Sequence, residues 1–275
     1  MSELDLVEKI RKRAGKPKGM VVGIGDDCAL YRPRHKEDLL FTTDPLIEGV
    51  HFVKGTDASR VGERALARSL SDIAAMGGEP RFCLISLTCP NDAKWIDGFY
   101  RGLLKLAAKT HTTLAGGDLS HGPAIHCEVM VCGAVPRAKA LVRSGAKVGD
   151  WIYVSAPLGK PWDSPIEPRL SLGKKLRASA SACMDISDGI SLDLHRLCKE
   201  SRVAAELDDV PVYPGATLER ALHGGEDYEL LWTSPRKSRL GFCVGRIVAG
   251  KPGLVRLRGI KVPPQGYDHF GIDIT

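Results

Sequence analysis

Acidic residues gather in this chain at the points where apolar, strand-like runs end. The stretch MDISDGISLDL (184–194) carries Asp185, Asp188 and Asp193 where an apolar strand should pass into a helix. The same kind of junction recurs in GIGDD (23–27), TTD (42–44), GGD (116–118) and GGED (224–227). Because loops at strand ends gather the functional side chains of open α/β sheets, these junctions predict one shared acidic site.

Clustered carboxylates repel one another unless a cation lies among them. Magnesium prefers oxygen ligands and typically bridges carboxylates to phosphates, and the hydroxyls of Thr42 and Thr43 beside Asp44 suit such a site. Asp72 shares one ridge of a predicted helix with small residues such as Ala65. We therefore expect Asp72 near the interior, although a solvated helix acid is an equally good interpretation. Glycosidases also use carboxylates, but they need only two of them.

The familiar nucleotide-binding signatures are missing from the sequence. It has no GxxxxGK[ST], GxGxxG or HRD motif, and it has neither GxSxG nor HExxH. If phosphates bind to this chain, we therefore expect metal ions to hold them, rather than a loop that cradles the phosphates.

Hydrophobic periodicity predicts strands that alternate with helices, which indicates an α/β or α+β fold. The expected strands are 20–25, 39–44, 81–88, 112–117, 125–135, 151–156, 182–186, 203–207, 227–233 and 242–248. The expected helices are 59–78, 92–109 and 188–200. The turn-rich segment RSGAKVGD (143–150) predicts an N-terminal domain at 1–142 and a C-terminal domain at 143–275, and the proline-rich stretch 159–169 should be a loop.

The composition is ordinary for a soluble globular protein, and its mild positive charge suits a small anionic substrate as well as a nucleic acid. The net charge is +6 and the pI is about 8.9, but the densest basic run, 11–18, contains no aromatic residue, so we expect no nucleic-acid partner. No apolar run is long enough to span a membrane, and the N-terminus lacks an apolar signal core. The eight cysteines form no CxxC pair, which favours buried thiols in a reducing cytoplasm.

The acidic junctions belong to a longer series of motifs, which resembles the thiamine-monophosphate kinase family. The motifs are GIGDDCAL, FTTDPLIEGVHF, ARSLSDIAAMGGEP, AGGDLS, VRSGAKVGDWIYV, MDISDGISLDL, GGEDYELLW and GYDHF. They occur in the order of that family and span residues 21 to 271. The family belongs to the superfamily of aminoimidazole ribonucleotide synthetase, and the GGEDYEL and GYDHF elements favour the kinase over its relatives.

The resemblance implies a two-domain fold of the aminoimidazole ribonucleotide synthetase type. Its N-terminal mixed sheet with flanking helices would dimerise, and a C-terminal α/β domain would complete the site. It also implies that ATP, with several Mg²⁺ ions, phosphorylates thiamine monophosphate to thiamine diphosphate. Two rivals remain, namely another ATP-using enzyme of the superfamily and a non-catalytic protein that binds nucleotides or thiamine phosphates.

The resemblance also implies roles for individual residues. Metal positions of the family match Asp27, Thr42, Thr43, Asp44, Asp72, Asp118, Asp185 and Asp188, of which Asp44, Asp118 and Asp188 are the expected catalytic acids. Positions that contact ATP match Gly117, Asp118, Arg143 and Ser187. Positions at the thiamine substrate match His51, Glu226 and Tyr267. Without the resemblance, Glu226 would be a turn acid and Tyr267 a packing residue, and Asp193 and His195 are expected to be ordinary helix residues.

The chain departs from the family pattern in two places. Relatives usually follow the strand at 151–156 with a glycine turn and an alanine-rich helix, whereas this chain continues directly into the loop at 159–169. The resemblance therefore implies a shortened C-terminal domain. Many relatives also carry a tyrosine before the GGD strand, where adenine can stack, and AAKTHTTLAGGD has none.

Overall fold

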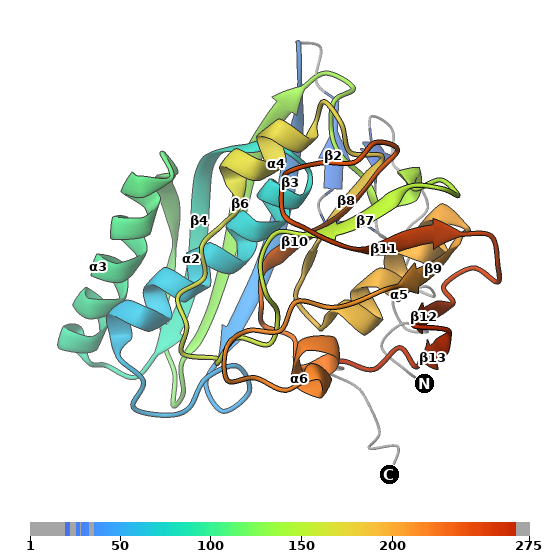
Figure 1. The fold of residues 1–275 in the computed structure, drawn as a ribbon. Coiled ribbons are helices and arrows are strands. Elements are labelled where there is room, and N and C mark those ends of the chain that lie inside the picture. The colour runs from blue at the N-terminus through green and yellow to red at the C-terminus, as the bar shows by residue number, and fades with distance from the viewer. Residues whose placement is uncertain (1–19, 23–25, 28, 33–35, 268–275) are drawn as a thin grey trace.

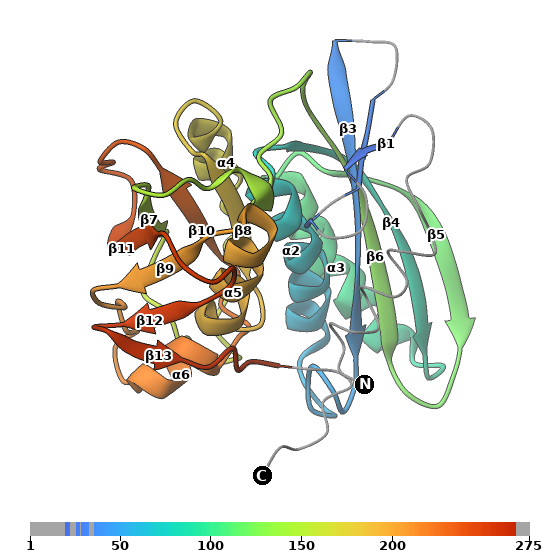
Figure 2. The same ribbon diagram turned by 90° about the vertical axis from the view of Figure 1, so that its right-hand side faces the viewer.

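Two mixed β-sheets face each other across a long central helix, α2 (Ala58–Ala75), as Figures 1 and 2 show. The computed structural model describes residues 20–22, 26–27, 29–32 and 36–267. Helix α2 begins at Asp57, whose side chain accepts a hydrogen bond from the Arg60 N–H at 3.0 Å. It ends before Gly77, which adopts a φ of +68°. The N–H of the next residue, Gly78, donates to the Ile73 carbonyl and closes the last turn.

The first sheet has the strand order β1-β2-β3-β6-β4-β5, in which only β4 and β5 are parallel. Its strands are β1 (Met20–Val22), β2 (Ala29–Tyr31), β3 (Glu37–Ile47), β4 (Glu79–Cys89), β5 (Thr113–His121) and β6 (His126–Pro136). Helices α2 and α3 (Ala93–Lys109) lie along one face (Figure 2). They approach closely at two glycines, because a Cβ at Gly62 or Gly102 would lie less than 2 Å from a carbonyl oxygen of the other helix.

The second sheet has the order β13-β12-β9-β11-β7-β10-β8. Its strands are β7 (Trp151–Val154), β8 (Ala182–Ile186), β9 (Ala204–Leu207), β10 (Glu229–Ser234), β11 (Phe242–Val248), β12 (Val255–Leu257) and β13 (Ile260–Val262). The remaining helices are the 3-10 turn η1 (Arg143–Gly145), α4 (Leu170–Leu176), α5 (Ile190–Ser201) and α6 (Leu218–His223). Side chains of α2 and α4 pack on one face of this sheet, and α5 and α6 pack on the other.

The predicted mixed α/β architecture is confirmed, and the three predicted helices and ten predicted strands are present with shifts of a few residues at their ends. The last part of the expected strand 20–25 lies outside the described residues. The sequence did not predict β2, β12, β13, α4 or α6, because elements of three to seven residues are too short to display a hydrophobic period. The last strand of the first sheet ends at residue 136, and the first strand of the second sheet begins at residue 151. The domain limits at 142 and 143 fall between these strands and remain a prediction.

Burial dominates the chemistry of the cysteines. The seven cysteines that the structure describes are free thiols, six of them buried, and burial raises the pKa of Cys127 to about 12. The prediction of buried thiols is therefore confirmed for six of these seven residues, whereas Cys243 is exposed. None of the helices in the described ranges is both long and apolar enough to cross a membrane.

The segment between β7 and α4 follows the second sheet as an irregular loop, held by two buried carboxylates. Asp227 accepts hydrogen bonds from the backbone of Gly159 at 2.8 Å and of Lys160 at 2.9 Å. Glu229, on β10, pairs with Lys160 and, at 2.7 Å, with Arg169. Charge pairing thus fixes a segment of the shortened domain that forms no helix of its own.

We predict that Glu229→Gln lowers the free energy of unfolding by about 3 kcal/mol, because it leaves two mostly buried cations without their carboxylate. The side chains of Lys160 and Arg169 are 15% and 24% exposed. Because water still reaches them, we expect a loss of stability at the lower end of the range for broken buried ion pairs. Urea unfolding followed by tryptophan fluorescence measures the change. As a control, Asp97→Asn removes the exposed pair with Arg101 and should cost less than about 0.5 kcal/mol. Equal losses in the two variants would contradict this account of the loop.

Candidate metal and nucleotide site

Three carboxylates meet where the central helix touches both halves of the chain. One oxygen each of Asp27, Asp72 and Asp185 lie within 4.8 Å of one another. Asp27 precedes β2, Asp72 belongs to the last part of α2, and Asp185 belongs to β8 of the second sheet. Neither sheet can form this cluster alone, so the fold itself assembles the site.

Hydroxyl groups and a further carboxylate surround the three acids. Ser71 Oγ donates to Asp185 Oδ2 at 2.7 Å, and Thr42 Oγ1 donates to the carboxylate of Asp72. Asp44 lies two residues beyond Thr42, so both side chains point to the same face of β3. The Oδ2 atom of Asp44 is buried and has no hydrogen-bond partner among the described residues. A buried oxygen in this state fits a position that a cation would occupy.

The protonation of these acids reflects burial and mutual repulsion. Burial, followed by the charges of Asp44, Asp185 and Asp27, raises the pKa of Asp72 well above its ordinary value. Burial and then Asp27 do the same for the pKa of Asp185, and burial also raises the pKa of Asp44. A set of oxygen donors that is costly to ionise without a cation suits a hard divalent ion such as Mg²⁺.

Arg143 lies beside this cluster, in the 3-10 turn η1. Its guanidinium pairs with Asp27, and its backbone N–H donates to Asp26 Oδ2 at 3.1 Å. Burial, followed by the charge of Asp27, raises the pKa of Asp26 to about 7. Arg143 is thus held at the site by two acids, and the contact with ATP that the resemblance implies for it remains a prediction.

The turn between β8 and α5 is shaped by Asp193. The backbone N–H groups of Ser187 and Asp188 donate to Asp193 Oδ2 at 3.1 and 3.0 Å, and Arg196 pairs with both Asp188 and Asp193. Asp193 is fully buried, and burial, followed by Asp188, raises its pKa to about 7. The expectation that Asp193 is an ordinary helix residue is therefore wrong, because its carboxylate fixes the DISD turn. Asp188 faces Arg196 and is not one of the three converging acids.

The three residues expected at the thiamine substrate lie near this turn. The Tyr267 N–H donates to the Asp188 carbonyl at 3.3 Å, and its ring centroid is 6.4 Å from that of His51. His51 Nδ1 accepts from the Ile47 N–H at 3.0 Å. Glu226 donates its N–H to the Ser187 carbonyl at 2.6 Å. The structure therefore brings all three beside the acidic turn.

Two arginines that sequence reasoning missed hold the carboxylate of Glu226. Arg64 pairs with it closely, Arg68 lies 3.4 Å away, and the Tyr228 hydroxyl donates to it at 3.1 Å. Although burial opposes the effect, Arg68 and Arg64 hold the pKa of Glu226 below its ordinary value. The signal in the sequence was the spacing of four residues, which puts two cations on one face of α2.

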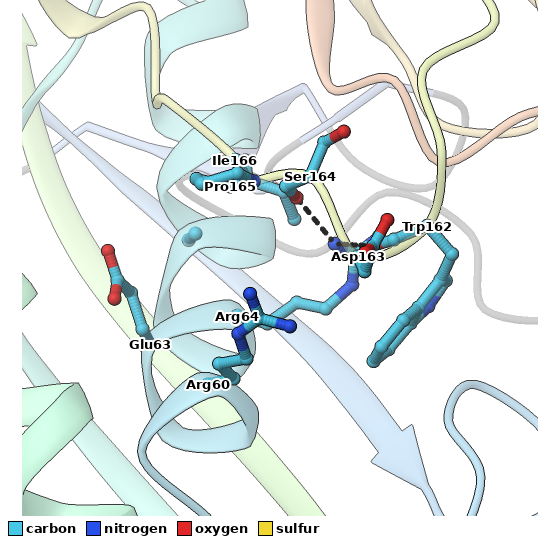
Figure 3. A pocket seen from close by; sticks show the side chains of 9 residues that line it. Arg60, Glu63, Arg64, Trp162, Asp163, Ser164, Pro165 and Ile166 are labelled. Carbon is cyan, nitrogen blue, oxygen red and sulfur yellow. Dashed lines mark hydrogen bonds between the residues drawn. The ribbon is translucent and has the colours of Figure 1, made fainter. Parts of the chain in front are cut away.

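A small cavity of about 110 Å³ lies beside Arg64, between the start of α2 and the loop 159–169 (Figure 3). The Arg64 guanidinium donates to the Trp162 carbonyl at 2.9 Å and lies 4.6 Å from the centroid of the Trp162 ring. Pro165 and Ile166 complete the wall of the cavity (Figure 3). Arg64 therefore links the loop, the central helix and Glu226.

Thr43, Gly117 and Asp118 lie elsewhere, on the face of the first sheet that α2 and α3 leave open. They line a hollow of about 300 Å³ together with Ser86 and Glu128. Thr43 Oγ1 donates to Glu128 Oε1 at 3.0 Å, and Asp118 is exposed. Alternation along β3 sends Thr43 away from the face of Thr42 and Asp44. Within one chain, the structure thus separates Thr43 and Asp118 from the converging acids.

Comparison with known proteins places this architecture in a class. Residues 25–135 match the family described as AIR synthase related protein, N-terminal domain. A solved structure described as AaThiL complexed with AMPPCP and TMP has a TM-score of 0.88 and 31% identity, covering 98% of this chain and 97% of that one. The fold is therefore of the aminoimidazole ribonucleotide synthetase type, as predicted.

Relatives of known activity show to which family within this fold type the chain belongs. The thiamine-monophosphate kinase of Escherichia coli (strain K12) is 35% identical over 302 aligned positions, which cover 90% of this chain and 92% of that protein. The crystal structure of thiamine-monophosphate kinase from Stenotrophomonas maltophilia K279a has a TM-score of 0.77 and 33% identity, covering 95% of this chain and 98% of that one. The chain belongs to the thiamine-monophosphate kinase family. Because 302 positions exceed the 275 residues here, part of the E. coli protein has no counterpart, in keeping with a shortened chain.

We predict that Mg²⁺ stabilises the protein more at about pH 8 than at about pH 5. The pKa values of Asp72 and Asp185 are raised in the folded state above the ordinary value of 3.8. Without metal, this contribution to folding stability is fully present below about pH 3.8 and is lost as the pH rises through the raised pKa values. The ion binds the carboxylates in their ionised form, so its contribution grows with pH. Thermal melting with Mg²⁺ or with chelator, at both pH values, measures the two effects.

The variant Asp72→Asn should melt about 2–4 °C higher than the parent protein without metal, because one repelling charge is gone, and should lose the response to Mg²⁺. The surface variant Asp97→Asn should behave as the parent. A Mg²⁺ response that Asp72→Asn leaves intact would remove Asp72 from the metal site.

Proposed function

We propose that this chain transfers the γ-phosphoryl group of ATP to thiamine monophosphate, giving thiamine diphosphate and ADP. The convergence of Asp27, Asp72 and Asp185 within 4.8 Å carries the proposal, because it gives the chain a place to hold cations between two phosphate-bearing substrates. Membership in the kinase family supports the same reaction. An AIR synthase relative with another acceptor and a non-catalytic binding protein are the rivals, and the assay described below distinguishes them.

Phosphoryl transfer needs alignment and charge neutralisation more than it needs a protein nucleophile. Asp27, Asp44, Asp72 and Asp185, with Thr42, would hold Mg²⁺, which neutralises phosphate charge and orients the reacting groups when it is bound. The acceptor oxygen belongs to a phosphate monoester whose second pKa is about 6, so it is largely ionised near neutral pH. No side chain therefore has to act as a general base.

The nucleotide would be held by groups around the DISD turn and on the open sheet face. We propose contacts from Ser187 and Arg143 near the acids. Gly117, Asp118 and Thr43 lie on the other face of the first sheet, so we propose that they contact the nucleotide and its metal across the dimer described below. The N-terminus of α5 follows Ser187 closely and adds partial positive charge. Asp44, Asp118 and Asp188 remain the acids to which we assign catalysis.

The acceptor, thiamine monophosphate, would lie at the end of the acidic cluster opposite to the nucleotide. His51 and Tyr267, whose ring centroids lie 6.4 Å apart with planes tilted by 52°, offer aromatic surface for the flat part of thiamine. Glu226 is paired with Arg64 and Arg68, so we assign it the role of ordering these cations and this end of the site, in addition to facing the cationic thiazolium. Free buried thiols also favour a reducing cytoplasm as the place of action.

We further propose a homodimer formed through the first sheet. One face of this sheet carries no helix within the described residues, and it exposes Leu84 at 37% beside Met130. An uncovered sheet surface with apolar side chains suits contact with a second copy. The hollow with Thr43 and Asp118 lies on the same face, which would bring those residues next to the partner.

The first test incubates the purified protein with ATP, Mg²⁺ and thiamine monophosphate and separates the products by chromatography. Thiamine diphosphate and ADP should form in equal amounts, and chelator should abolish the reaction. Asp44→Asn should lower kcat at least about a hundredfold, the order expected when one electrostatic contact to the transition state is lost. Glu37→Gln, at an exposed position of the same strand, should keep normal turnover. Full turnover in excess chelator would refute the proposal.

A second test concerns the acceptor end. Tyr267→Ala and Glu226→Gln should each raise KM for thiamine monophosphate about tenfold, because each change weakens the binding of this substrate. KM for ATP should stay the same. Tyr267→Phe retains the ring and should remain within about twofold of the parent. If KM for ATP rose instead, the two ends of the site would have to be exchanged.

The third test addresses the dimer. Light scattering at micromolar concentration should give the mass of two chains. Leu84→Asp puts a charge on the open sheet face and should produce monomers, whereas Leu104→Asp, on the exposed side of α3, should leave the dimer intact. An active parent protein with the mass of one chain would contradict the proposed assembly.

A further inference from the structure

Two buried arginines lie one helical turn apart on α2 and both approach Glu226, but their surroundings differ. The Arg64 guanidinium donates to the Trp162 carbonyl at 2.9 Å and to the Ser164 carbonyl at 3.4 Å (Figure 3). It pairs closely with Glu226. It also lies over the Trp162 ring. Both terminal nitrogens of Arg64 therefore have partners within the protein, although its Nε, like that of Arg68, has none among the described residues. These partners make Arg64 a structural link.

Arg68 is as deeply buried, at 7% exposure, but has far fewer partners. Its single hydrogen bond to a described residue goes to Glu226 Oε1 at 3.4 Å, which is long for a charged pair. Its Nε has no partner among the residues that the structure describes. A guanidinium carries five N–H donors, and leaving them unsatisfied in a buried position is costly. Arg68 is thus built to receive a further acceptor group.

The charges around Arg68 point to an anion. Despite burial, the pKa of Arg68 is raised, chiefly by Tyr228 and then by Glu226 and Asp44. Glu226 already has Arg64 as its closer partner. Asp44 is a proposed metal ligand, so a bound cation would compensate its charge. Asp188, the remaining acid near Arg68, pairs with Arg196, so with the metal present Arg68 would keep a positive charge that no carboxylate neutralises fully.

We propose that Arg68 binds the phosphate group of the acceptor and thereby makes the site select phosphorylated thiamine over free thiamine. This inference rests on the proposed function. A planar guanidinium suits a phosphate because two parallel N–H groups can bind two oxygens at once. Its neighbours Glu226 and Tyr228 belong to the acceptor end, whereas Asp44 belongs to the metal cluster. Arg68 therefore lies where the acceptor phosphate must approach the metals.

Titration calorimetry in Mg²⁺ measures the Kd of thiamine monophosphate, of thiamine and of the ATP analogue AMPPCP. In Arg68→Gln, the Kd of thiamine monophosphate should rise about tenfold to a hundredfold, the effect of losing a charged hydrogen-bonding group. The Kd of thiamine should hardly change, because thiamine has no phosphate. Arg68→Lys should recover part of the affinity, since it retains the charge but not the planar fork.

Two control variants separate a phosphate contact from a structural effect. Arg60→Gln removes the same charge from an exposed position of the same helix and should leave all three Kd values unchanged. Arg64→Gln should weaken thiamine and thiamine monophosphate by the same factor, because it loosens the acceptor end as a whole. The ratio of the two Kd values therefore reports on Arg68 alone.

The outcomes distinguish this inference from the proposed function. If the parent protein binds neither thiamine compound, the proposed function fails. If the parent prefers thiamine monophosphate and Arg68→Gln keeps the same preference, only the role of Arg68 is refuted. A loss confined to AMPPCP would overturn the inference as well, because it would assign Arg68 to the nucleotide phosphates.

Discussion

The mutual repulsion of buried carboxylates is the constraint on which this structure depends. Asp27, Asp72 and Asp185 come from three separate parts of the chain, and burial and neighbouring acids disfavour a negative charge on Asp72 and on Asp185. Such a cluster destabilises the protein unless a cation joins it. Packing against α2 on both sides forces the acids together, so stability is sacrificed at the one place where the proposed chemistry needs a binding site for metal ions.

Helix α2 is the element through which the two sheets act together. Its C-terminal part carries Asp72, which belongs to the metal cluster. Closer to its N-terminus, Arg64 and Arg68 lie on one face of the helix and reach Glu226. Opposite charges are therefore arranged along a single rigid helix, with the acids at one end and the cations at the other. A phosphate acceptor fits between them, because it needs metal ions on one side and a fixed guanidinium on the other.

The loop between β7 and α4 shows how charge pairing can hold a segment without regular structure. Asp227 and Glu229 bind the loop at 159–169 from the sheet side, and Arg64 binds it from the helix side. The same arginine pairs with Glu226, so the loop and the acceptor end are mechanically connected. The acids do not depend on a helix in this segment, because α2 and β8 support them.

The sequence by itself determined the alternation of strands and helices, the acidic junctions and the family, because period, turn residues and motif order are local properties. It could not determine which junctions meet. Thr42 and Thr43 are adjacent in the chain but face opposite sides of β3, so Thr43 and Asp118 lie apart from Asp72. Likewise, the roles of Arg64 and Arg68 depend on Glu226, which is 162 and 158 residues away in the chain, and only the packing of α2 brings them into contact with it. Those roles follow from long-range burial and charge, which no local pattern records.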